Sequence, residues 1–233
     1  MKVLLLYTSH RQVKELKIAQ FLYNKDPFLK TMDILFHCNN PDIDKYAVTE
    51  ILNGFESPNI GTIFTSVNSG ANTGVAEAIN SVYDQLADYD YVIHLHPDVF
   101  ILSSEKLQQA LESNDPEQTD FIAWEINREY GMPPGKRRTL EYASDFFIFS
   151  PKERNNIFKD YVQYWTDNPH IQGQPGANSG CERFLGYQTQ KYGLNVAYLD
   201  RGLYGGMRTE LEPLGIWHCH NLRQIEQYLH RNF

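Results

Sequence analysis

Cysteine is scarce in this chain of 233 residues. Cys38, Cys181 and Cys219 are an odd number of thiols, and none forms a Cys-x-x-Cys pair or a repeating pattern. This excludes a disulfide framework and a thiolate zinc site as the basis of the fold. We therefore expect the protein to work in a reducing compartment and to be cytoplasmic.

Positive charge is also in short supply. The chain has 21 Lys and Arg against 29 Asp and Glu, which gives a formal net charge of −8. Proteins that bind nucleic acid in general carry a basic surface for the phosphate backbone. We therefore expect no nucleic-acid partner, and an anionic ligand would have to be held by a few local groups.

No apolar run in the sequence is long enough to cross a bilayer, which takes about 20 residues. The first twelve residues contain one Lys and a short apolar run that ends in polar residues, without a small-residue cleavage site. This pattern is typical of a first β-strand rather than of a signal peptide. We expect no membrane span and one domain over residues 1–233.

Glycine is missing from the turn after the first strand. Tyr7-Thr8-Ser9-His10 stands where a dinucleotide oxidoreductase carries Gly-x-Gly-x-x-Gly. A nucleotidyltransferase is a closer alternative, because it shares the sheet topology and the use of metal. It commonly has a Gly-rich, basic loop at this point, which the chain lacks. Gly131–Lys136 lacks the four-residue gap of a P-loop, and no Ser or Thr follows the Lys.

Apolar runs alternate with helical patterns over the first hundred residues. Val13, Leu16, Ala19 and Tyr23 recur at helical spacing, Val75–Leu86 is a second predicted helix, and a third is expected to begin around Glu105. This order predicts an α/β fold whose parallel sheet is covered on both faces. The predicted strands are 2–7, 32–37, 59–66, 91–95, 121–125, 146–149 and 195–199.

Two further helices are expected in the second half. Ser150-Pro151-Lys152-Glu153 has the pattern of a helix start, with Ser as N-cap and Pro at the first helical position. Glu182–Tyr192 is the other predicted helix, and Gly193 ends it.

His96 and Asp98 come directly after the buried strand that ends at Leu95. Ligands of open α/β sheets bind at the carboxyl ends of the strands, and residues i and i+2 point the same way there. The two side chains could therefore bind one divalent cation, which would neutralise a diphosphate leaving group. A nitrogen and oxygen pair favours Mn²⁺ over Mg²⁺. The alternative is that Asp98 caps a turn and His96 is a satisfied buried histidine.

His218 and His220 form a second i, i+2 pair near the C-terminus. If this segment returns to the edge of the sheet, one of the two histidines supplies a further metal ligand. The alternative is a surface His-x-His pair that binds no metal.

Taken in order, these segments resemble a known family. A polar turn after the first strand, Asn39-Asn40-x-Asp42, Asn68-x-Gly70-x-Asn72-x-Gly74 and Leu95-His96-Pro97-Asp98 are similar to the nucleotide-binding half of GT-A-fold glycosyltransferases. The resemblance implies a GT-A-like, Rossmann-like three-layer α/β/α sandwich with a mostly parallel central sheet. Residues 1–103 would be the nucleotide-sugar-binding half and residues 104–233 the acceptor-binding half.

The same resemblance implies roles for individual residues. Asp98 would bind a metal, Mn²⁺ or Mg²⁺, at the family's Asp-x-Asp motif, with His96 in place of the first Asp. A C-terminal histidine, His218 or failing that His220, would complete the metal shell. The nucleotide sugar would be bound by Thr8, Ser9, Asp42, Asn68, Gly70, Gly74 and His96.

Glu182 is the candidate general base at the start of its predicted helix, where inverting family members keep an acidic residue. A carboxylate within reach of an acceptor hydroxyl can take its proton. Alternatively, Glu182 only complements the helix dipole. Asp145 is the competing base, or it positions a sugar hydroxyl.

The resulting hypothesis is a metal-assisted, inverting transfer of a sugar from a nucleoside-diphosphate sugar to a hydroxyl of a glycan or other acceptor. Two alternatives stay open at this stage. One is a catalytically inactive module that binds nucleotide sugar or glycan, and the other is a sugar-phosphate nucleotidyltransferase.

Overall fold

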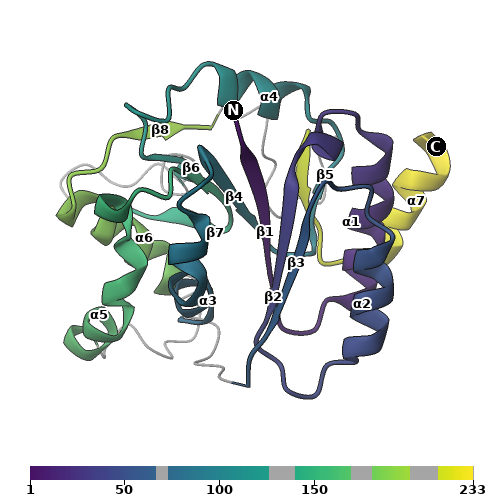
Figure 1. Ribbon diagram of the computed structural model, residues 1–233, viewed down its shortest axis with the longest axis horizontal. Helices are drawn as coiled ribbons and strands as arrows, with labels where there is room; N and C mark the ends of the chain where they lie inside the picture. The colour runs from purple at the N-terminus through teal and green to yellow at the C-terminus, as the bar shows by residue number, and fades with distance from the viewer. Residues whose placement is uncertain (67–72, 126–139, 169–179, 200–214, 233) are drawn as a thin grey trace, which may run out of the picture.

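The computed structural model describes residues 1–66, 73–125, 140–168, 180–199 and 215–232, and its centre is one twisted β-sheet (Figure 1). The seven strands of this sheet lie in the order β3-β2-β1-β4-β7-β6-β8. Their bounds are β1 Val3–Ser9, β2 Asp33–Cys38, β3 Ile60–Phe64, β4 Tyr91–Leu95, β6 Phe121–Glu125, β7 Tyr142–Phe149 and β8 Val196–Tyr198.

Most neighbouring strands of this sheet run parallel. β1 pairs in parallel with β2 and β4, β2 with β3, and β6 with β8. β7 is antiparallel to both of its neighbours, β4 and β6. Because β7 runs the other way, its first residues lie beside the carboxyl end of β4, and the backbone N–H of His96 donates to the carbonyl of Asp145 at 3.1 Å.

Helices cover both faces of the sheet, which confirms the predicted three-layer α/β/α architecture. In Figure 1, α1 (Val13–Lys25), α2 (Lys45–Asn53) and α7 (Leu222–Asn232) lie on one side of the sheet. The helices α3 (Gly74–Val82), α5 (Tyr161–Asp167) and α6 (Gly180–Lys191) lie on the other. The helix α4 (Glu105–Glu112) adds buried leucines to the core on the side of α1.

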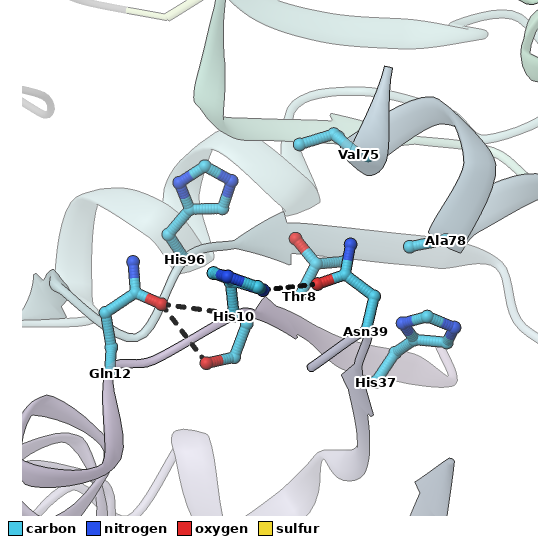
Figure 2. Close-up of a pocket in the computed structure, with 10 residues that line it drawn as sticks. Thr8, His10, Gln12, His37, Asn39, Val75, Ala78 and His96 are labelled. Atoms are coloured by element: carbon cyan, nitrogen blue, oxygen red, sulfur yellow. Dashed lines mark hydrogen bonds between the residues drawn. The ribbon is translucent and has the colours of Figure 1, made fainter. Parts of the chain in front are cut away.

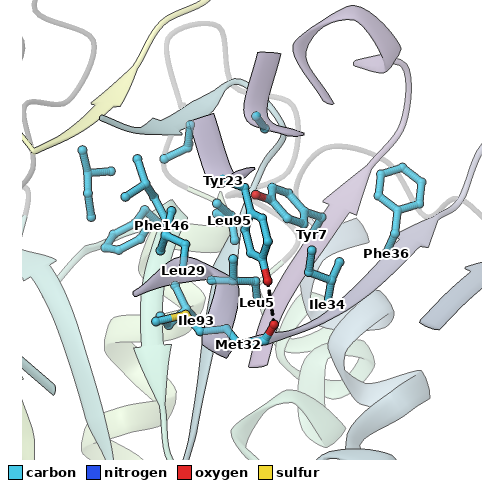
Figure 3. Packing of buried hydrophobic residues seen from close by; sticks show 14 of the residues in the cluster. Leu5, Tyr7, Tyr23, Leu29, Met32, Ile34, Phe36, Ile93, Leu95 and Phe146 are labelled. Atoms are coloured by element: carbon cyan, nitrogen blue, oxygen red, sulfur yellow. Dashed lines mark hydrogen bonds between the residues drawn. The ribbon is translucent and has the colours of Figure 1, made fainter. Parts of the chain in front are cut away.

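The core under α1 joins side chains of the central strands to those of the helix (Figure 3). Tyr23 is almost completely buried there, and its hydroxyl donates to the carbonyl of Met32 at 2.8 Å. Its ring meets the edge of Phe55, with the ring centroids 5.2 Å apart. A buried tyrosine whose hydroxyl is hydrogen-bonded adds apolar area without leaving a polar group unsatisfied. This contact fixes α1 against the strand that follows it.

A small second sheet joins the middle of the chain to its end. The strands β5 (Val99–Ile101) and β9 (Ile216–His218) pair antiparallel, with Val99 opposite His218. Next to this pair, the N–H of Cys219 donates to the carbonyl of Asp98 at 3.0 Å. The C-terminal segment thus returns to the carboxyl end of β4, which was the condition for either of its histidines to join Asp98.

The helix expected to start at Ser150 does not form there, so this prediction was wrong. Lys152 has extended backbone, and two short 3-10 turns, η4 (Glu153–Asn155) and η5 (Ile157–Asp160), precede α5. The side chain of Asn155 explains the difference, because it donates to the carbonyl of Ser150 at 3.2 Å and to a carboxylate oxygen of Asp120 at 2.9 Å. Side-chain bonds of this kind compete with a helical start.

Two helices, α2 and α7, were not predicted from the sequence. The helix α2 is nine residues long and buries Val48 and Leu52, so its apolar pattern covers few positions. Its start is capped by Asp44, whose Oδ1 accepts from the N–H of Ala47 at 3.0 Å. Among the described residues, none of the helices has the length and apolar character needed to cross a membrane.

The position of α6 depends on a glycine, and we predict that Gly186→Ala destabilises the protein. A Cβ at Gly186 would overlap the backbone carbonyl of Leu140, at the entry to β7. Overpacking against backbone costs about 1–3 kcal/mol. We expect urea denaturation to show a free energy of unfolding lower by about this amount.

Gly54→Ala is the matched control, because its Cβ would meet the far end of the flexible Gln20 side chain. We expect it to change the free energy of unfolding much less. Equal costs for the two variants would contradict the close docking of α6.

Candidate functional site

The strand order creates a switch point between β1 and β4. The chain runs outward from β1 through β2 to β3 and then returns by α3 to β4, on the other side of β1. Ligands of open α/β sheets bind at this point, outside the carboxyl ends of the strands. A pocket of about 320 Å³ lies here (Figure 2). It is lined by Thr8, Ser9, His10, Gln12, His37, Asn39, Gly74, Val75, Ala78 and His96.

Several residues predicted to bind the nucleotide sugar line this pocket. Thr8 and Ser9 come from β1, Gly74 from the start of α3, and His96 from the turn after β4. Asp42 is exposed and is not among the lining residues, so its role stays a prediction. Asn68 and Gly70 lie outside the described residues.

Other lining residues were not assigned a role from the sequence. His10 and Asn39 belong to polar segments that follow β1 and β2, which was the available signal, and His10 Nδ1 lies 3.2 Å from Asn39 Oδ1. His37, on β2 itself, and the apolar Val75 and Ala78 gave no signal, because only the tertiary structure places them over the pocket. Figure 2 shows the side chains of His10 and Asn39 directed toward each other, with His96 on the side of His10 and His37 on the side of Asn39.

The rim of the pocket is held by side-chain hydrogen bonds. Gln12 Oε1 accepts from the Ser9 hydroxyl at 3.1 Å and from the N–H of His10 at 3.3 Å. The side-chain amide of Asn40 donates to the carbonyl of His10 at 2.9 Å. These contacts shape the turn without any ligand. Apolar walls with a few fixed polar groups are typical of small-molecule sites.

Three residues form a group that could hold a metal ion. The ligand atoms of Asp98, His218 and His220 all lie within 4.8 Å of one another. Asp98 Oδ2 is 2.8 Å from His220 Nδ1 and 3.7 Å from His218 Nε2. The structure thus brings together three of the four residues expected at the metal, whereas His96 is outside this group and lines the pocket.

Asp145 orients one of these histidines. Its Oδ2 lies 2.6 Å from His218 Nδ1, so this ring nitrogen faces a carboxylate and Nε2 faces Asp98. Metal-binding histidines generally donate their other ring N–H to such a carboxylate, which fixes the tautomer and the ring orientation. Asp145 is therefore better placed to orient His218 than to act as a general base.

Two buried polar atoms of the group indicate that a cation would fit there. Asp98 Oδ1 and His218 Nε2 are buried, and neither has a hydrogen-bond partner among the described residues. A buried polar atom without a partner costs about 1–3 kcal/mol, so two of them on neighbouring residues of this group call for an explanation. A divalent cation would satisfy both atoms. One carboxylate and two imidazoles suit Mn²⁺ and other first-row transition metals better than Mg²⁺, which prefers oxygen ligands.

The charges in this group are coupled. Burial lowers the pKa of His218, but its contacts with Asp145 and Asp98 outweigh that effect and raise the pKa to about 10. Burial raises the pKa of Asp98, but the nearby histidines outweigh this effect and hold the pKa below its usual value. A cation bound at His218 Nε2 must therefore displace a proton, and its affinity falls as the pH falls.

Glu182 stands in the first turn of α6, where it contacts Ser144, the residue before Asp145. Its Oε1 accepts from the Ser144 hydroxyl at 2.7 Å. Burial raises the pKa of Glu182 to about 7, and the charges of Asp145 and Glu141 act in the same direction. A general base works best when its pKa lies near the operating pH. Glu182 is therefore suited to take a proton at neutral pH.

Comparison with known proteins identifies the fold. No family model and no curated protein matches the chain. Among solved structures, the galactosyltransferase LgtC in complex with donor and acceptor sugar analogues matches 94% of this chain and 87% of its own, with a TM-score of 0.60 and 14% identity. Mouse xyloside xylosyltransferase 1, in its apo form, matches 94% of this chain and 97% of its own, with a TM-score of 0.58 and 12% identity. The chain has the GT-A fold.

A third GT-A structure contains a nucleotide sugar and a metal. The mannosyltransferase PcManGT from Pyrobaculum calidifontis, in complex with GDP-Man and Mn²⁺, matches 84% of this chain and 54% of its own, with a TM-score of 0.55 and 10% identity. In the present chain, the pocket and the group of Asp98, His218 and His220 both lie at the carboxyl end of β4. His96 lines the pocket and precedes Asp98 by two residues.

We predict that the Asp98 group binds Mn²⁺ without any nucleotide. Asp98→Ala removes the carboxylate and should abolish binding, whereas Asp145→Asn only loosens His218 and should weaken it by about 10–100-fold. Titration of Mn²⁺ followed by electron paramagnetic resonance measures both effects.

Glu182→Gln serves as the control, because Glu182 is not part of the metal group. We expect its Mn²⁺ affinity to equal that of the wild type. Unchanged affinity in Asp145→Asn would rule out the supporting role of Asp145.

Proposed function

We propose that the protein is a glycosyltransferase that moves a sugar from a nucleoside-diphosphate sugar to a hydroxyl group of a glycan or other acceptor. The observation that carries the proposal is the adjacency of two sites. His96 lines the pocket, and Asp98, two residues further along the same turn, belongs to the metal group. A nucleoside in the pocket would therefore place its diphosphate beside the metal group. The galactosyl-, xylosyl- and mannosyltransferases of the same fold support this assignment.

The donor would be held by both halves of the chain. Thr8, Ser9 and Gly74 would bind the nucleoside, and His96 would stand beside the diphosphate. Asp98, His218 and His220 would hold Mn²⁺, or less favourably Mg²⁺, which when bound would neutralise the charge of the leaving diphosphate. Residues 1–103 then form the donor half, together with His218 at the end of β9 and His220, which follows this strand. Asp42, Asn68 and Gly70 complete the proposed donor contacts.

Glu182 would act as the general base. It would take the proton of the acceptor hydroxyl while that oxygen attacks the anomeric carbon and the bond from this carbon to the diphosphate breaks. This single displacement inverts the anomeric configuration. Asp145 is the second choice as base, because its Oδ2 already faces His218 Nδ1 at 2.6 Å.

A nucleotide panel gives the first test of the proposal. We expect one of UDP, GDP, CDP and dTDP to raise the melting temperature in the presence of Mn²⁺. A ligand at a hundred times its Kd adds about 2.7 kcal/mol, or roughly 5–10 °C for a domain of this size. A shift of the same size without Mn²⁺ would contradict the role of the metal. Absence of a shift with every nucleotide would overturn the proposed function in favour of a module that recognises glycan alone.

We further predict that Glu182→Gln leaves nucleotide affinity unchanged and lowers turnover by about 10²–10⁴, the usual contribution of a positioned base. The base must be ionised, so wild-type kcat/KM should rise with pH through about 7, the raised pKa of Glu182. At saturating Mn²⁺, where the pH dependence of metal affinity does not contribute, the variant should lack this rise. Steady-state kinetics between pH 5 and about 9 measure both effects, a range that brackets this pKa.

Glu105→Gln is the matched control, because Glu105 is also an acidic residue in the first turn of a helix, α4, and is exposed. If Glu182 only complemented the helix dipole, the two variants would behave alike. Proton NMR of the product should show an inverted anomeric configuration, and a retained configuration would contradict a single displacement with Glu182 as base.

A further inference from the structure

A serine of β7 contacts the candidate base. Ser144 is half-buried, and its hydroxyl donates to Glu182 Oε1 at 2.7 Å. The next residue, Asp145, faces His218 Nδ1. Consecutive side chains of a strand point to opposite faces, so one short segment of β7 can reach both α6 and the metal group. The proposed reaction assigns Ser144 no role of its own.

The pairing of β7 with β6 is irregular where Ser144 lies. Ala123 of β6 pairs with Phe147, whereas Glu125 pairs with Tyr142. β7 therefore has more residues than β6 between these two pairs, and Ser144 is one of them. Bulges of this kind occur next to active sites, where they change the direction of a side chain. A local feature of the sheet thus contributes to the position of Ser144, in addition to its contact with α6.

The surroundings of Glu182 oppose its ionisation. Burial raises the pKa of Glu182 to about 7, and the charges of Asp145 and Glu141, both on β7, act in the same direction. On α6, the next residue is Arg183, whose Nε donates to Glu141 Oε1 at 2.8 Å. The preceding residue, Cys181, is a buried free thiol. A buried carboxyl group beside two carboxylates needs hydrogen-bond donors if it is to be ionised at neutral pH.

The hydroxyl of Ser144 is such a donor. Against the effect of burial, this hydroxyl and the backbone N–H of Glu182 both lower the pKa of the carboxyl group, and the hydroxyl lowers it more. A hydrogen bond to an ionised acceptor is stronger than one to a neutral acceptor, so the contact favours the carboxylate over the acid. A general base must be ionised to accept a proton. The contact therefore acts on the property of Glu182 that the proposed reaction requires.

We propose that Ser144 is a positioning residue of the reaction, whose hydroxyl holds one oxygen of the Glu182 carboxylate and keeps this group ionised for the acceptor. The inference rests on the proposed function, because it requires Glu182 to be the base. Ser144 takes no proton itself. The proton of the acceptor hydroxyl passes to the carboxylate, and the hydroxyl of Ser144 keeps its own.

The pH dependence of Ser144→Ala tests the inference. The variant loses the hydrogen bond, so the pKa of Glu182 should rise by roughly one unit, the effect of one hydrogen bond to a charged group. At saturating Mn²⁺, kcat/KM should then fall by about 10-fold below about pH 6 and approach the wild-type value at about pH 9. Ser144→Thr keeps a hydroxyl and should restore the wild-type profile.

Carbon NMR measures the carboxyl group of Glu182 directly. Its signal is assigned by its loss in Glu182→Gln, and titration should show a pKa higher in Ser144→Ala than in the wild type by roughly one unit. This measurement needs neither a sugar donor nor Mn²⁺, so it tests the contact independently of turnover.

Ser104→Ala is the matched control. Ser104 is buried, and its hydroxyl donates to a carboxylate oxygen of Asp26 at 2.8 Å. Neither residue belongs to the pocket lining or to the metal group. The variant loses a hydrogen bond of the same kind, so it should lower stability and leave the pKa of Glu182 and the rate profile unchanged. An equal shift in Ser104→Ala would overturn the positioning role of Ser144.

The outcomes separate the two proposals. If the wild type transfers sugar from no nucleotide donor, the proposed function fails. If it transfers sugar but Ser144→Ala keeps the wild-type rate profile and the wild-type pKa of Glu182, the positioning role is overturned and the proposed function stands. A loss of activity in Ser144→Ala by the same factor at every pH would likewise overturn this role, because a purely structural change has that effect.

Discussion

The short pairing of β5 with β9 is the constraint on which the candidate metal group depends. Val99 lies opposite His218, and the N–H of Cys219 bonds to the carbonyl of Asp98. In this register His218 and His220, two residues apart, both reach Asp98. A slip by one residue would reverse the faces and direct Trp217 and Cys219 there instead. Trp217 instead packs with Tyr228 of α7, so the terminal helix supports the register.

The reversed direction of β7 extends this group toward the candidate base. Because β7 is antiparallel to β4, its early residues Ser144 and Asp145 lie at the edge where β4 ends. Asp145 faces His218 from there, and Ser144 donates to Glu182 of α6. A series of contacts thus leads from Asp98 through His218 and Asp145 to the start of α6. Close docking of α6 at Gly186, against the entry to β7, fixes the far end of this series.

The charge of the protein is consistent with this arrangement. The net charge is −8, and the pocket's lining, as far as the described part of the chain provides it, includes histidines but neither Lys nor Arg. These described lining residues would give a bound diphosphate no fixed positive charge. The carboxylate and imidazole ligands of the candidate metal group offer a compact alternative, since a bound divalent cation places positive charge where the diphosphate would lie.

Local patterns predicted the first half of the fold well. Buried apolar runs marked β1 and β4, and helical spacing marked α1, because each of these elements shows its period within its own residues. The polar residues that follow these strands then predicted where a ligand would bind, since parallel strands end at one edge. The predicted helix at Ser150 failed because Asp120, thirty residues earlier in the chain, engages Asn155 and the backbone of Ser150.

By itself, the sequence determined the α/β alternation, the edge where the pocket lies, and the candidates Asp98, His218, His220 and Glu182. Only the tertiary structure decided which of them meet. It placed His96 in the pocket and outside the metal group, it turned Asp145 toward His218, and it buried His94 against Thr8. These contacts join residues far apart in the chain, and they depend on strand direction and register, which the spacing of residues within a single segment does not encode.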